Sequence, residues 1–385
     1  MKVCHLIEGL GSGGAERLLY TNLKYLNPDV ISSEVITVFP QDEHWKNPIQ
    51  ELGVPVRSLE CESKKDIPKA IVRLTKMLRE SKPDLLHTHL WTANIIGRIS
   101  GYLAKVPVLS SIHNPDYEVE ALTDGSQISA SKNFIIRNLD RWTARLFCRE
   151  MIAVSEYVKH STHKRLSFPE EKIKSLYNPV DVRAFQTEFG IDRKAFLTSF
   201  GIPEQAIVLL NVARISPQKG FLYAVQALPQ IKAKFPNAHL VSVGAMNDKN
   251  WLGKIENEID RLNLGDSVHF LGAQKDVVKF LQTCDLFLFP SLHEGLGIAL
   301  IEAMVCGCAC IASRTGPIPE FITHEVNGLL VPPRNPKSLA ESVCELLADE
   351  EKRKSLGAAA REMVLTRFSP QPAADKLAQI YLSTV

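Results

Sequence analysis

Short apolar runs rich in β-branched residues alternate with longer amphipathic segments along the chain, and this alternation limits the possible folds more than any other feature. Chains in which strands and helices alternate form parallel sheets with helices on both faces. In the first half, the pattern predicts strands at 3–7, 34–39, 84–87, 106–112 and 151–154, and helices at 16–26, 69–81, 92–104 and 141–149. The sequence therefore predicts an α/β fold with a doubly wound parallel sheet.

The same alternation begins again after a polar, irregular stretch at 178–198. It predicts further strands at 206–212, 239–243, 268–270, 286–289 and 310–312, and helices at 221–234, 252–262 and 298–305. A length of 385 residues also suggests two domains, because a single core rarely grows beyond about 250–300 residues. We predict two Rossmann-like domains, 1–180 and 190–368, that face each other across a cleft, and a C-terminal helix within 369–385 that packs back on the first.

The composition is that of an ordinary globular protein, with 45% hydrophobic and 23% charged residues. A net charge of +2 gives no reason to expect nucleic acid as a partner. The apolar run at the N-terminus is too short for a signal peptide, and no run reaches the roughly 20 apolar residues of a membrane span. The sequence therefore predicts a cytoplasmic protein.

The eight cysteines do not indicate a disulfide framework in a chain of this length. Cys306, Cys308 and Cys310 alternate in a small apolar run, and no histidine follows at the spacing of a zinc site. These cysteines are either a metal or redox site or small core residues, and the sequence favours core residues. We expect neither a metal nor another cofactor.

The segment EGLGSGGAE, residues 8–16, follows the first predicted strand and opens a helix. Its glycines at 9, 11 and 14 fit the G-x-G-x-x-G pattern, which lets a backbone approach a phosphate at a helix N-terminus. The dinucleotide form of this motif needs an acidic residue about 20 positions later, and only Asp42 lies near the end of the second strand. The segment is either a ligand-binding loop that faces the cleft or a tight turn without a ligand.

A second loop, VARISPQKG at 212–220, follows the strand predicted at 206–212. It places Arg214 and Lys219 at the carboxyl end of a strand, where open α/β sheets bind their ligands. A forked guanidinium and a mobile ammonium together suit a diphosphate. The alternative is a pair of solvated surface cations.

A third loop, within SLHEGLGIALIEAMVCGC at 291–308, carries Glu294 and leads into a helix that carries Glu302. The backbone N–H groups of Gly295, Leu296 and Gly297 would point outward at the helix start, where an anion is favoured. Carboxylates that bind sugar or ribose hydroxyls would explain both glutamates. The alternative is a capping glutamate and a surface glutamate, although the apolar neighbours of Glu302 argue against exposure.

His113 directly follows the strand predicted at 106–112, at the carboxyl edge of the first sheet. A single histidine is more often structural than catalytic, but this position favours a functional role. His87 and His89 also follow a strand end and are weaker candidates.

These motifs resemble those of glycosyltransferase family 4, whose members are retaining, nucleotide-sugar-dependent enzymes with the GT-B fold. The most specific part is the pair of glutamates eight positions apart, together with its flanks. The resemblance extends along nearly the whole chain through GGAE, HTHLW, SIH, AVSEYV, YNPVD, NVARISPQKG, VGAMND, FLGAQKDV and CDLFLFPS.

By this resemblance, Glu294 would contact the transferred sugar and Glu302 would bind the ribose hydroxyls of the nucleotide. Arg214 and Lys219 would hold the diphosphate. The helix start near Gly297 would help to stabilise the charge that develops on the leaving group.

The resemblance also implies roles in the first domain, which would bind the acceptor while the second binds the nucleotide sugar. Gly13 and Gly14 would belong to a loop that closes on the donor phosphate, and His113 would lie near the donor sugar. The backbone from Gly272 to Asp276 would frame the base, and the loops around 116–131 would contact the acceptor.

The activity implied is a retaining, hexosyltransferase-type transfer from a UDP- or GDP-linked sugar to a hydroxyl of a glycan or lipid-linked glycan, in cell-surface polysaccharide biosynthesis. Retention would follow from same-face attack assisted by the leaving phosphate, without a metal. The alternatives are an NAD-dependent oxidoreductase, a non-catalytic nucleotide-sugar-binding protein, and another enzyme of the same fold.

The segment 132–149 is a basic, aromatic helix with Arg137, Arg141 and Arg145 spaced four residues apart. It could provide peripheral contact with the inner face of the cytoplasmic membrane, where a lipid-linked acceptor would lie. The sequence favours instead a domain helix with solvated arginines, because a core helix also needs an apolar face.

Overall fold

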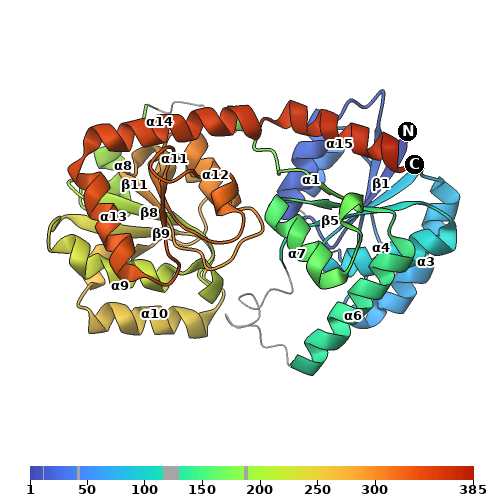
Figure 1. Ribbon diagram of the computed structural model, residues 1–385, viewed down its shortest axis with the longest axis horizontal. Helices are drawn as coiled ribbons and strands as arrows, with labels where there is room; N and C mark the ends of the chain where they lie inside the picture. The colour runs from blue at the N-terminus through green and yellow to red at the C-terminus, as the bar shows by residue number, and fades with distance from the viewer. Residues whose placement is uncertain (12, 41–43, 116–129, 186–189) are drawn as a thin grey trace. The chain divides into compact units, whose positions relative to one another are not determined.

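The computed structural model describes residues 1–11, 13–40, 44–115, 130–185 and 190–385, and Figure 1 shows its helices and strands. These residues form two compact units. Unit 1 contains residues 1–115, 130–180 and 368–385, and unit 2 contains residues 181–185 and 190–367. Asp42 and most of the predicted acceptor loop at 116–131 lie outside the described residues.

Unit 1 is built on a seven-stranded parallel sheet with the strand order β3-β2-β1-β4-β5-β6-β7. Its strands are β1 (Lys2–Ile7), β2 (Ser32–Thr37), β3 (Val56–Ser58), β4 (Leu85–His89), β5 (Val108–Ile112), β6 (Glu150–Ala153) and β7 (Ile173–Ser175). Its helices are α1 (Gly14–Tyr25), α2 (Lys46–Glu51), α3 (Ile67–Ser81), α4 (Trp91–Ala104), α6 (Ala130–Phe147), α7 (Glu156–Leu166) and α15 (Pro370–Thr384). The central strand β4 is buried at every position, as expected for a strand covered on both faces.

Unit 2 is built on a six-stranded parallel sheet with the strand order β10-β9-β8-β11-β12-β13. Its strands are β8 (Ile207–Val212), β9 (Ala238–Val243), β10 (Val268–Phe270), β11 (Leu286–Phe289), β12 (Cys310–Ser313) and β13 (Leu329–Val331). Its helices are α8 (Arg193–Ser199), α9 (Phe221–Lys232), α10 (Lys249–Arg261), α11 (Val277–Thr283), α12 (Ile298–Val305), α13 (Pro336–Ala348) and α14 (Glu350–Arg367). The predicted fold class, two doubly wound parallel sheets, is confirmed.

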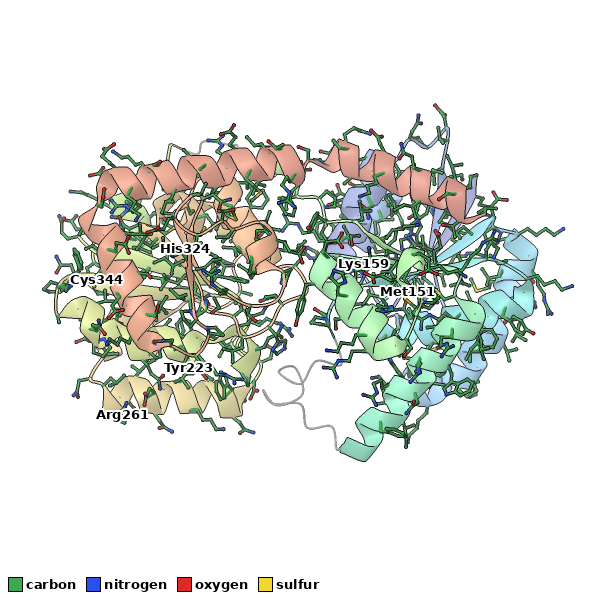
Figure 2. The ribbon with its side chains drawn as sticks, viewed as in Figure 1. Met151, Lys159, Tyr223, Arg261, His324 and Cys344 are labelled. Carbon is green, nitrogen blue, oxygen red and sulfur yellow. The ribbon has the colours of Figure 1, made fainter. Side chains whose placement is uncertain are left out.

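Each unit has its own apolar core between its sheet and its helices. In Figure 2, buried Met151 of β6 lies in unit 1, and buried Cys344 of α13 lies in unit 2. Cys308 and Cys310 are also buried in unit 2, and loss of solvation raises the pKa of the Cys306 thiol to about 12. Cys308 and Cys310 are therefore core residues, and the half-buried Cys306 thiol is protonated at neutral pH.

The C-terminal helix α15 follows unit 2 in the chain but packs on the helices and sheet of unit 1 (Figure 1). Leu377 and Tyr381 of α15 join an apolar cluster with Val3 of β1 and Ile152 of β6. The side chain of Tyr381 is fully buried there. The chain therefore crosses from unit 2 back to unit 1 before it ends.

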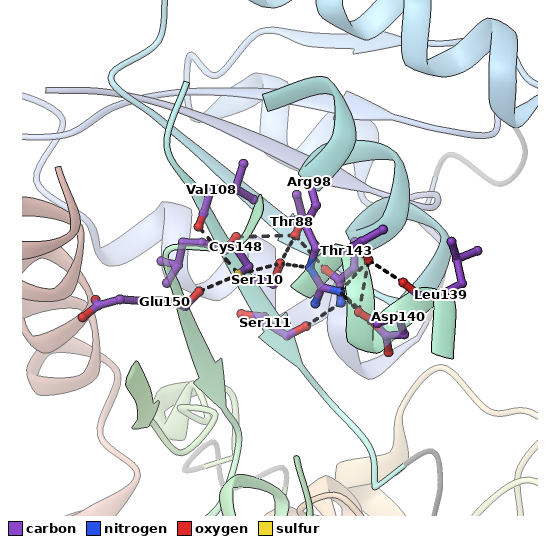
Figure 3. Close-up of polar contacts among 12 residues, drawn as sticks. Thr88, Arg98, Val108, Ser110, Ser111, Leu139, Asp140, Thr143, Cys148 and Glu150 are labelled. Atoms are coloured by element: carbon purple, nitrogen blue, oxygen red, sulfur yellow. Dashed lines mark hydrogen bonds and ion pairs between the residues drawn. The ribbon is translucent and has the colours of Figure 1, made fainter. Parts of the chain in front are cut away.

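A buried charge pair fixes α6 to α4 in unit 1 (Figure 3). Arg98 of α4 is fully buried and forms an ion pair with Asp140 of α6, and its Nε donates to Ser110 Oγ of β5 over 3.0 Å. Buried charges are tolerated only when they are paired and hydrogen-bonded in this way. The inward face of α6 therefore combines this charge with buried Thr143 and Ala144.

Among the described residues, no helix is both long enough and apolar enough to cross a membrane.

Candidate functional site

The order of strands in unit 2 changes direction between β8 and β11, because β8 pairs with β9 on one side and with β11 on the other. Open α/β sheets bind ligands beyond the carboxyl ends of the strands at such a point. The two loops that leave β8 and β11 there carry Arg214, Lys219 and Glu294, and Glu302 lies on α12, the helix after β11. The fold thus brings four of the predicted site residues to one edge of one sheet.

The loops after β8 and β11 are held against each other by backbone contacts. Leu292 N donates to Gln218 O over 2.8 Å, and Gln218 Nε2 donates to His293 O over 3.0 Å. Gly220 has a φ of +64°, and a Cβ at this position would lie 2.0 Å from Pro290 O. Only glycine allows this close approach, so the sequence K-G at 219–220 fixes where Lys219 lies.

Lys219 and Glu294 form an ion pair across these two loops. Lys219 Nζ lies 2.6 Å from Glu294 Oε1, and the side chains are 17% and 7% exposed. Lys219 also lies 6.0 Å from the centre of the Phe289 ring. This arrangement keeps an ammonium group nearly dehydrated at the carboxyl edge of the sheet, where its charge acts more strongly on a ligand than it would in water.

Glu302 lies on α12 and is only 6% exposed, and its neighbours Ile301 and Ala303 are fully buried. The interpretation of Glu302 as a surface glutamate is therefore wrong. Gly297 precedes α12 with a φ of +91° and provides no side-chain cap for the helix. The helix start, reached through Gly295 and Leu296, thus offers backbone N–H groups to an anion.

Arg214 is exposed on the loop after β8 and forms no ion pair with any residue that the structure describes. The neighbouring loops after β9 and β10 are joined by a bond from Gly244 N to Gly272 O of 2.8 Å. The loops that follow β8, β9 and β10 therefore form one continuous rim at this edge of the sheet. Gly272 lies on this rim, where the frame for the base is predicted.

The order of strands in unit 1 also changes direction, and it does so between β1 and β4. The loop after β1 leads to Gly13, which caps α1, and to Gly14, its first residue. Glu8 Oε1 in this loop accepts a hydrogen bond from Thr92 N of α4 over 2.7 Å. This contact joins the loops that follow β1 and β4. Ser12 of the first loop lies outside the described residues.

His113 follows β5, the strand beside β4. Its Nε2 is buried and has no hydrogen-bond partner among the described residues. Burial lowers the pKa of His113 to about 4, so the ring is neutral at pH 7. The ring of His89 lies 5.7 Å from that of His113. A neutral imidazole can donate or accept a hydrogen bond but does not offer a charge to a phosphate.

Two features at this edge of unit 1 had no signal in the sequence. Leu90, directly after His89, has a φ of +73°, which is rare for a residue other than glycine. His5 lies in the apolar strand β1 and reads as a core residue, yet its ring contacts those of His87 and His89. Neither a strained backbone nor a contact between strands can be read from local patterns.

Two family models match the chain over most of its length. The description "Glycosyltransferase Family 4" matches residues 12–184, and "Glycosyl transferases group 1" matches residues 192–363. The chain belongs to glycosyltransferase family 4. The predicted family and the enzyme class are therefore confirmed.

Two relatives whose names state an activity cover most of the chain. N-acetyl-alpha-D-glucosaminyl L-malate synthase of Bacillus anthracis is 29% identical over 315 residues, which is 80% of this chain and 77% of the relative. The UDP-Gal:alpha-D-GlcNAc-diphosphoundecaprenol alpha-1,3-galactosyltransferase of Escherichia coli is 26% identical over 353 residues, 90% of this chain and 87% of the relative. The acceptors of these two relatives differ, so membership of the family does not decide the acceptor.

The solved structure of Anabaena Alr3699/HepE in complex with UDP-glucose has the same fold. It superposes with a TM-score of 0.85 and 23% identity, over 100% of both chains. The GT-B fold of this family 4 glycosyltransferase is thereby confirmed. The oxidoreductase alternative and the non-catalytic alternative are set aside, and the roles of single residues remain predictions.

Proposed function

We propose that this glycosyltransferase uses a UDP-linked sugar and transfers it, with retention, to a hydroxyl of a glycan or lipid-linked glycan. The observation that carries the proposal is the Lys219–Glu294 pair at the strand-order change of unit 2, followed in the chain by buried Glu302 on α12. The choice of UDP over GDP is supported by the UDP and UDP-glucose complexes of HepE and by the UDP-galactose donor of the Escherichia coli relative.

Cleavage of the bond between sugar and phosphate places negative charge on the departing diphosphate. Arg214, Lys219 and the start of α12 would stabilise this charge without reorganising during the reaction. Glu294 would hold hydroxyls of the transferred sugar, and Glu302 would hold those of the ribose. The acceptor hydroxyl would attack on the same face that the diphosphate leaves, and a phosphate oxygen would take its proton.

Unit 1 would bind the acceptor in this scheme. Gly13 and Gly14 would provide backbone N–H groups at the start of α1. His113 is neutral at pH 7 because its pKa is lowered to about 4 by burial. It is therefore suited to hydrogen-bond a sugar hydroxyl and unsuited to hold the charge of the diphosphate.

The nucleotide assignment can be tested by thermal unfolding with UDP, GDP, ADP, NAD and the common sugar conjugates. We expect UDP at about 100 times its dissociation constant to stabilise the wild-type protein by about 2.7 kcal/mol. Glu302→Ala should lose most of this stabilisation, because two ribose hydroxyls lose their acceptor. Glu341→Ala, which removes an exposed glutamate on α13, is the matched control.

A response to GDP alone would replace UDP by GDP in the proposal, with the site unchanged. A response of Glu302→Ala equal to that of the wild type would contradict the ribose role of this residue. Stabilisation by none of the nucleotides would contradict the proposed function itself.

We further propose that α6 makes the contact with a membrane. Phe134, Ile135, Trp142 and Leu146 of this helix are each 61–65% exposed, while Asp140 on the opposite face is buried. The inward face of α6 holds Asp140 together with fully buried Ala144, so these four apolar side chains lie outside the core that the helix contacts. An exposed apolar face of this kind indicates a binding surface.

The charge on α6 favours a bilayer that carries anionic lipids. Arg137, Arg141 and Arg145 lie along the same helix as the exposed aromatic residues. Arginines beside aromatic and aliphatic side chains are typical of helices that lie in the interface of an anionic membrane. A lipid-linked acceptor would be presented at such a surface.

Replacing Phe134 and Trp142 together by serine is expected to weaken binding to phosphatidylglycerol-containing vesicles by at least about tenfold. The reason is that burial of one large apolar side chain contributes about 1.5–3 kcal/mol. Vesicle flotation measures the effect, and Val72→Ser on α3, at a residue that is 71% exposed, is the control. Absence of wild-type binding to anionic vesicles, or equal binding by the double variant, would exclude α6 as the docking surface.

A further inference from the structure

Three histidine side chains meet inside unit 1 at the point where its strand order changes direction. His5 lies on β1, and His87 and His89 lie on the adjacent strand β4, where His87 is directly opposite His5. One ring nitrogen from each histidine lies within 4.8 Å of those from the other two. All three rings are at most 1% exposed. Two neighbouring parallel strands thus aim three imidazoles at one point.

Most of the ring nitrogens in this cluster have no hydrogen-bond partner. Both nitrogens of His5 and both nitrogens of His89 are buried without a partner among the residues that the structure describes. A buried donor or acceptor without a partner costs about 1–3 kcal/mol. Four such atoms in one place are costly for a structural core, and they indicate that the cluster binds a ligand.

The third histidine is already oriented by its neighbours. His87 Nδ1 lies 2.7 Å from Tyr381 Oη of α15, and His87 Nε2 lies 2.8 Å from Ser111 Oγ of β5. With Nδ1–H donating to the tyrosine, Nε2 accepts a hydrogen bond from Ser111 Oγ–H, and a bound metal would replace this hydroxyl at the Nε2 lone pair. Histidines that bind metals are usually fixed in this way, with the second ring nitrogen bonded to a neighbouring group.

The chemistry of the cluster matches a divalent transition metal better than any other ligand. No carboxylate belongs to the group, so Mg²⁺ and Ca²⁺ are disfavoured, whereas neutral imidazoles are preferred ligands of Zn²⁺. Zinc binds histidine nitrogens at about 2.0–2.1 Å, which places three such nitrogens roughly 3.4 Å apart in a tetrahedral site. The three nitrogens lie within 4.8 Å of one another, so each would move closer to its neighbours when the metal binds.

We propose that His5, His87 and His89 form a structural site for a divalent transition metal, with Zn²⁺ as the natural occupant. Tyr381 supports the site through His87, so the metal would couple the C-terminal helix α15 to β1 and β4. The site plays no part in the sugar transfer proposed above. It would stabilise unit 1 whether or not that proposal is correct.

The test uses the full chain without a histidine tag, stripped with a chelator and then equilibrated with ZnCl₂. After removal of free metal, bound zinc per chain is measured by elemental analysis. We expect about one zinc per wild-type chain and less than about a tenth of that in His89→Ala. The control is His239→Ala, because His239 and His269 form the other close histidine pair, with Nδ1 and Nε2 separated by 3.0 Å.

Two further measurements guard against misfolding and adventitious binding. His5→Leu replaces a buried ring that forms no hydrogen bond with the described residues, and it should lose zinc while its circular dichroism stays that of the wild type. Tyr381→Phe should weaken zinc affinity by about 10–100-fold without abolishing binding, because it removes only the supporting bond.

Zinc should also raise the melting temperature of the wild type and of His239→Ala, but not that of His89→Ala or His5→Leu. Retention of zinc by His89→Ala and His5→Leu, or loss of zinc in His239→Ala alone, would place the metal elsewhere and overturn the proposal. A wild-type chain that retains no zinc after equilibration would overturn it as well.

Discussion

Replacing Lys219 by alanine is expected to lower kcat/KM by about 10³-fold, or roughly 4 kcal/mol of transition-state stabilisation. Lys219 Nζ lies 2.6 Å from Glu294, and its side chain is only 17% exposed. A charge held in such a dry environment acts on a developing diphosphate with little screening. Its loss should lower kcat as well as affinity, since the leaving group gains negative charge as the reaction proceeds.

The same substitution also leaves Glu294 buried without its partner. Breaking a buried ion pair costs the folded state about 3–5 kcal/mol, so stability must be separated from catalysis. The double variant Lys219→Met/Glu294→Gln removes both charges and should recover most of the stability. Its activity should remain at the level of Lys219→Ala, because neither functional charge returns.

A matched control is available within unit 2. Lys352 Nζ lies 2.6 Å from Glu345 Oε1, at the same separation as the proposed catalytic pair but on α13 and α14. Lys352→Ala should leave kcat/KM unchanged. If Lys219→Ala retained more than a tenth of wild-type kcat/KM, or if Lys352→Ala lost as much, the assignment of Lys219 to the diphosphate would be wrong.

Lowering the pH from about 7.5 to about 5.5 is expected to reduce the free energy of unfolding of unit 1 by about 5–6 kcal/mol. Four histidines contribute, and one of them is His113, whose pKa burial lowers to about 4. Burial lowers the pKa of His5 from 6.5 to about 3. Burial also lowers the pKa values of His87 and His89 well below 6.5, with smaller contributions from neighbouring histidines. Each such histidine lowers the free energy of unfolding by about 1.4 kcal/mol when the pH is one unit below the pKa that it has in the unfolded chain.

The sign of this effect follows from which state binds the proton. Below pH 6.5 the unfolded chain binds protons at these histidines while the folded chain does not, so the equilibrium moves toward unfolding. The stability is complete above the unfolded pKa and is lost as the pH falls toward the folded values. Paired carboxylates contribute little in this window, because their ordinary pKa values lie near about 4.

Urea unfolding followed by tryptophan fluorescence measures the effect. Trp45, Trp91 and Trp142 lie in unit 1 and only Trp251 lies in unit 2, so three of the four tryptophans report on the unit that carries the histidines. The measurement is made with a chelator at both pH values, so that no metal contributes to the difference.

His5→Leu should reduce the loss between the two pH values by about 1.4 kcal/mol, because one proton-binding group disappears from the unfolded chain. Equal unfolding midpoints of the wild type at both pH values would show that the cluster does not titrate as its burial requires.

The sequence by itself determined the fold class and the family, and it predicted one compact group of candidate site residues. Strong local patterns carried these predictions, such as the buried strands β1, β8 and β11, the loop VARISPQKG, and the glutamates before and on α12. These patterns are readable because each is complete within a short segment. Three short edge strands, β3, β7 and β13, were missed, because three residues carry little periodicity, although β10, which is equally short, was predicted.

Tertiary structure decided the features that depend on residues far apart in the chain. The amphipathic pattern of α6 indicated a core-facing apolar side, but the pair of Arg98 and Asp140 places a charge on the inward face, while several large apolar side chains of the helix are exposed. His5 and His87 are 82 positions apart in the sequence and meet only because β1 and β4 are adjacent in the sheet. Local propensity cannot specify such contacts, because their energy arises from burial and pairing that exist only once the sheet has formed.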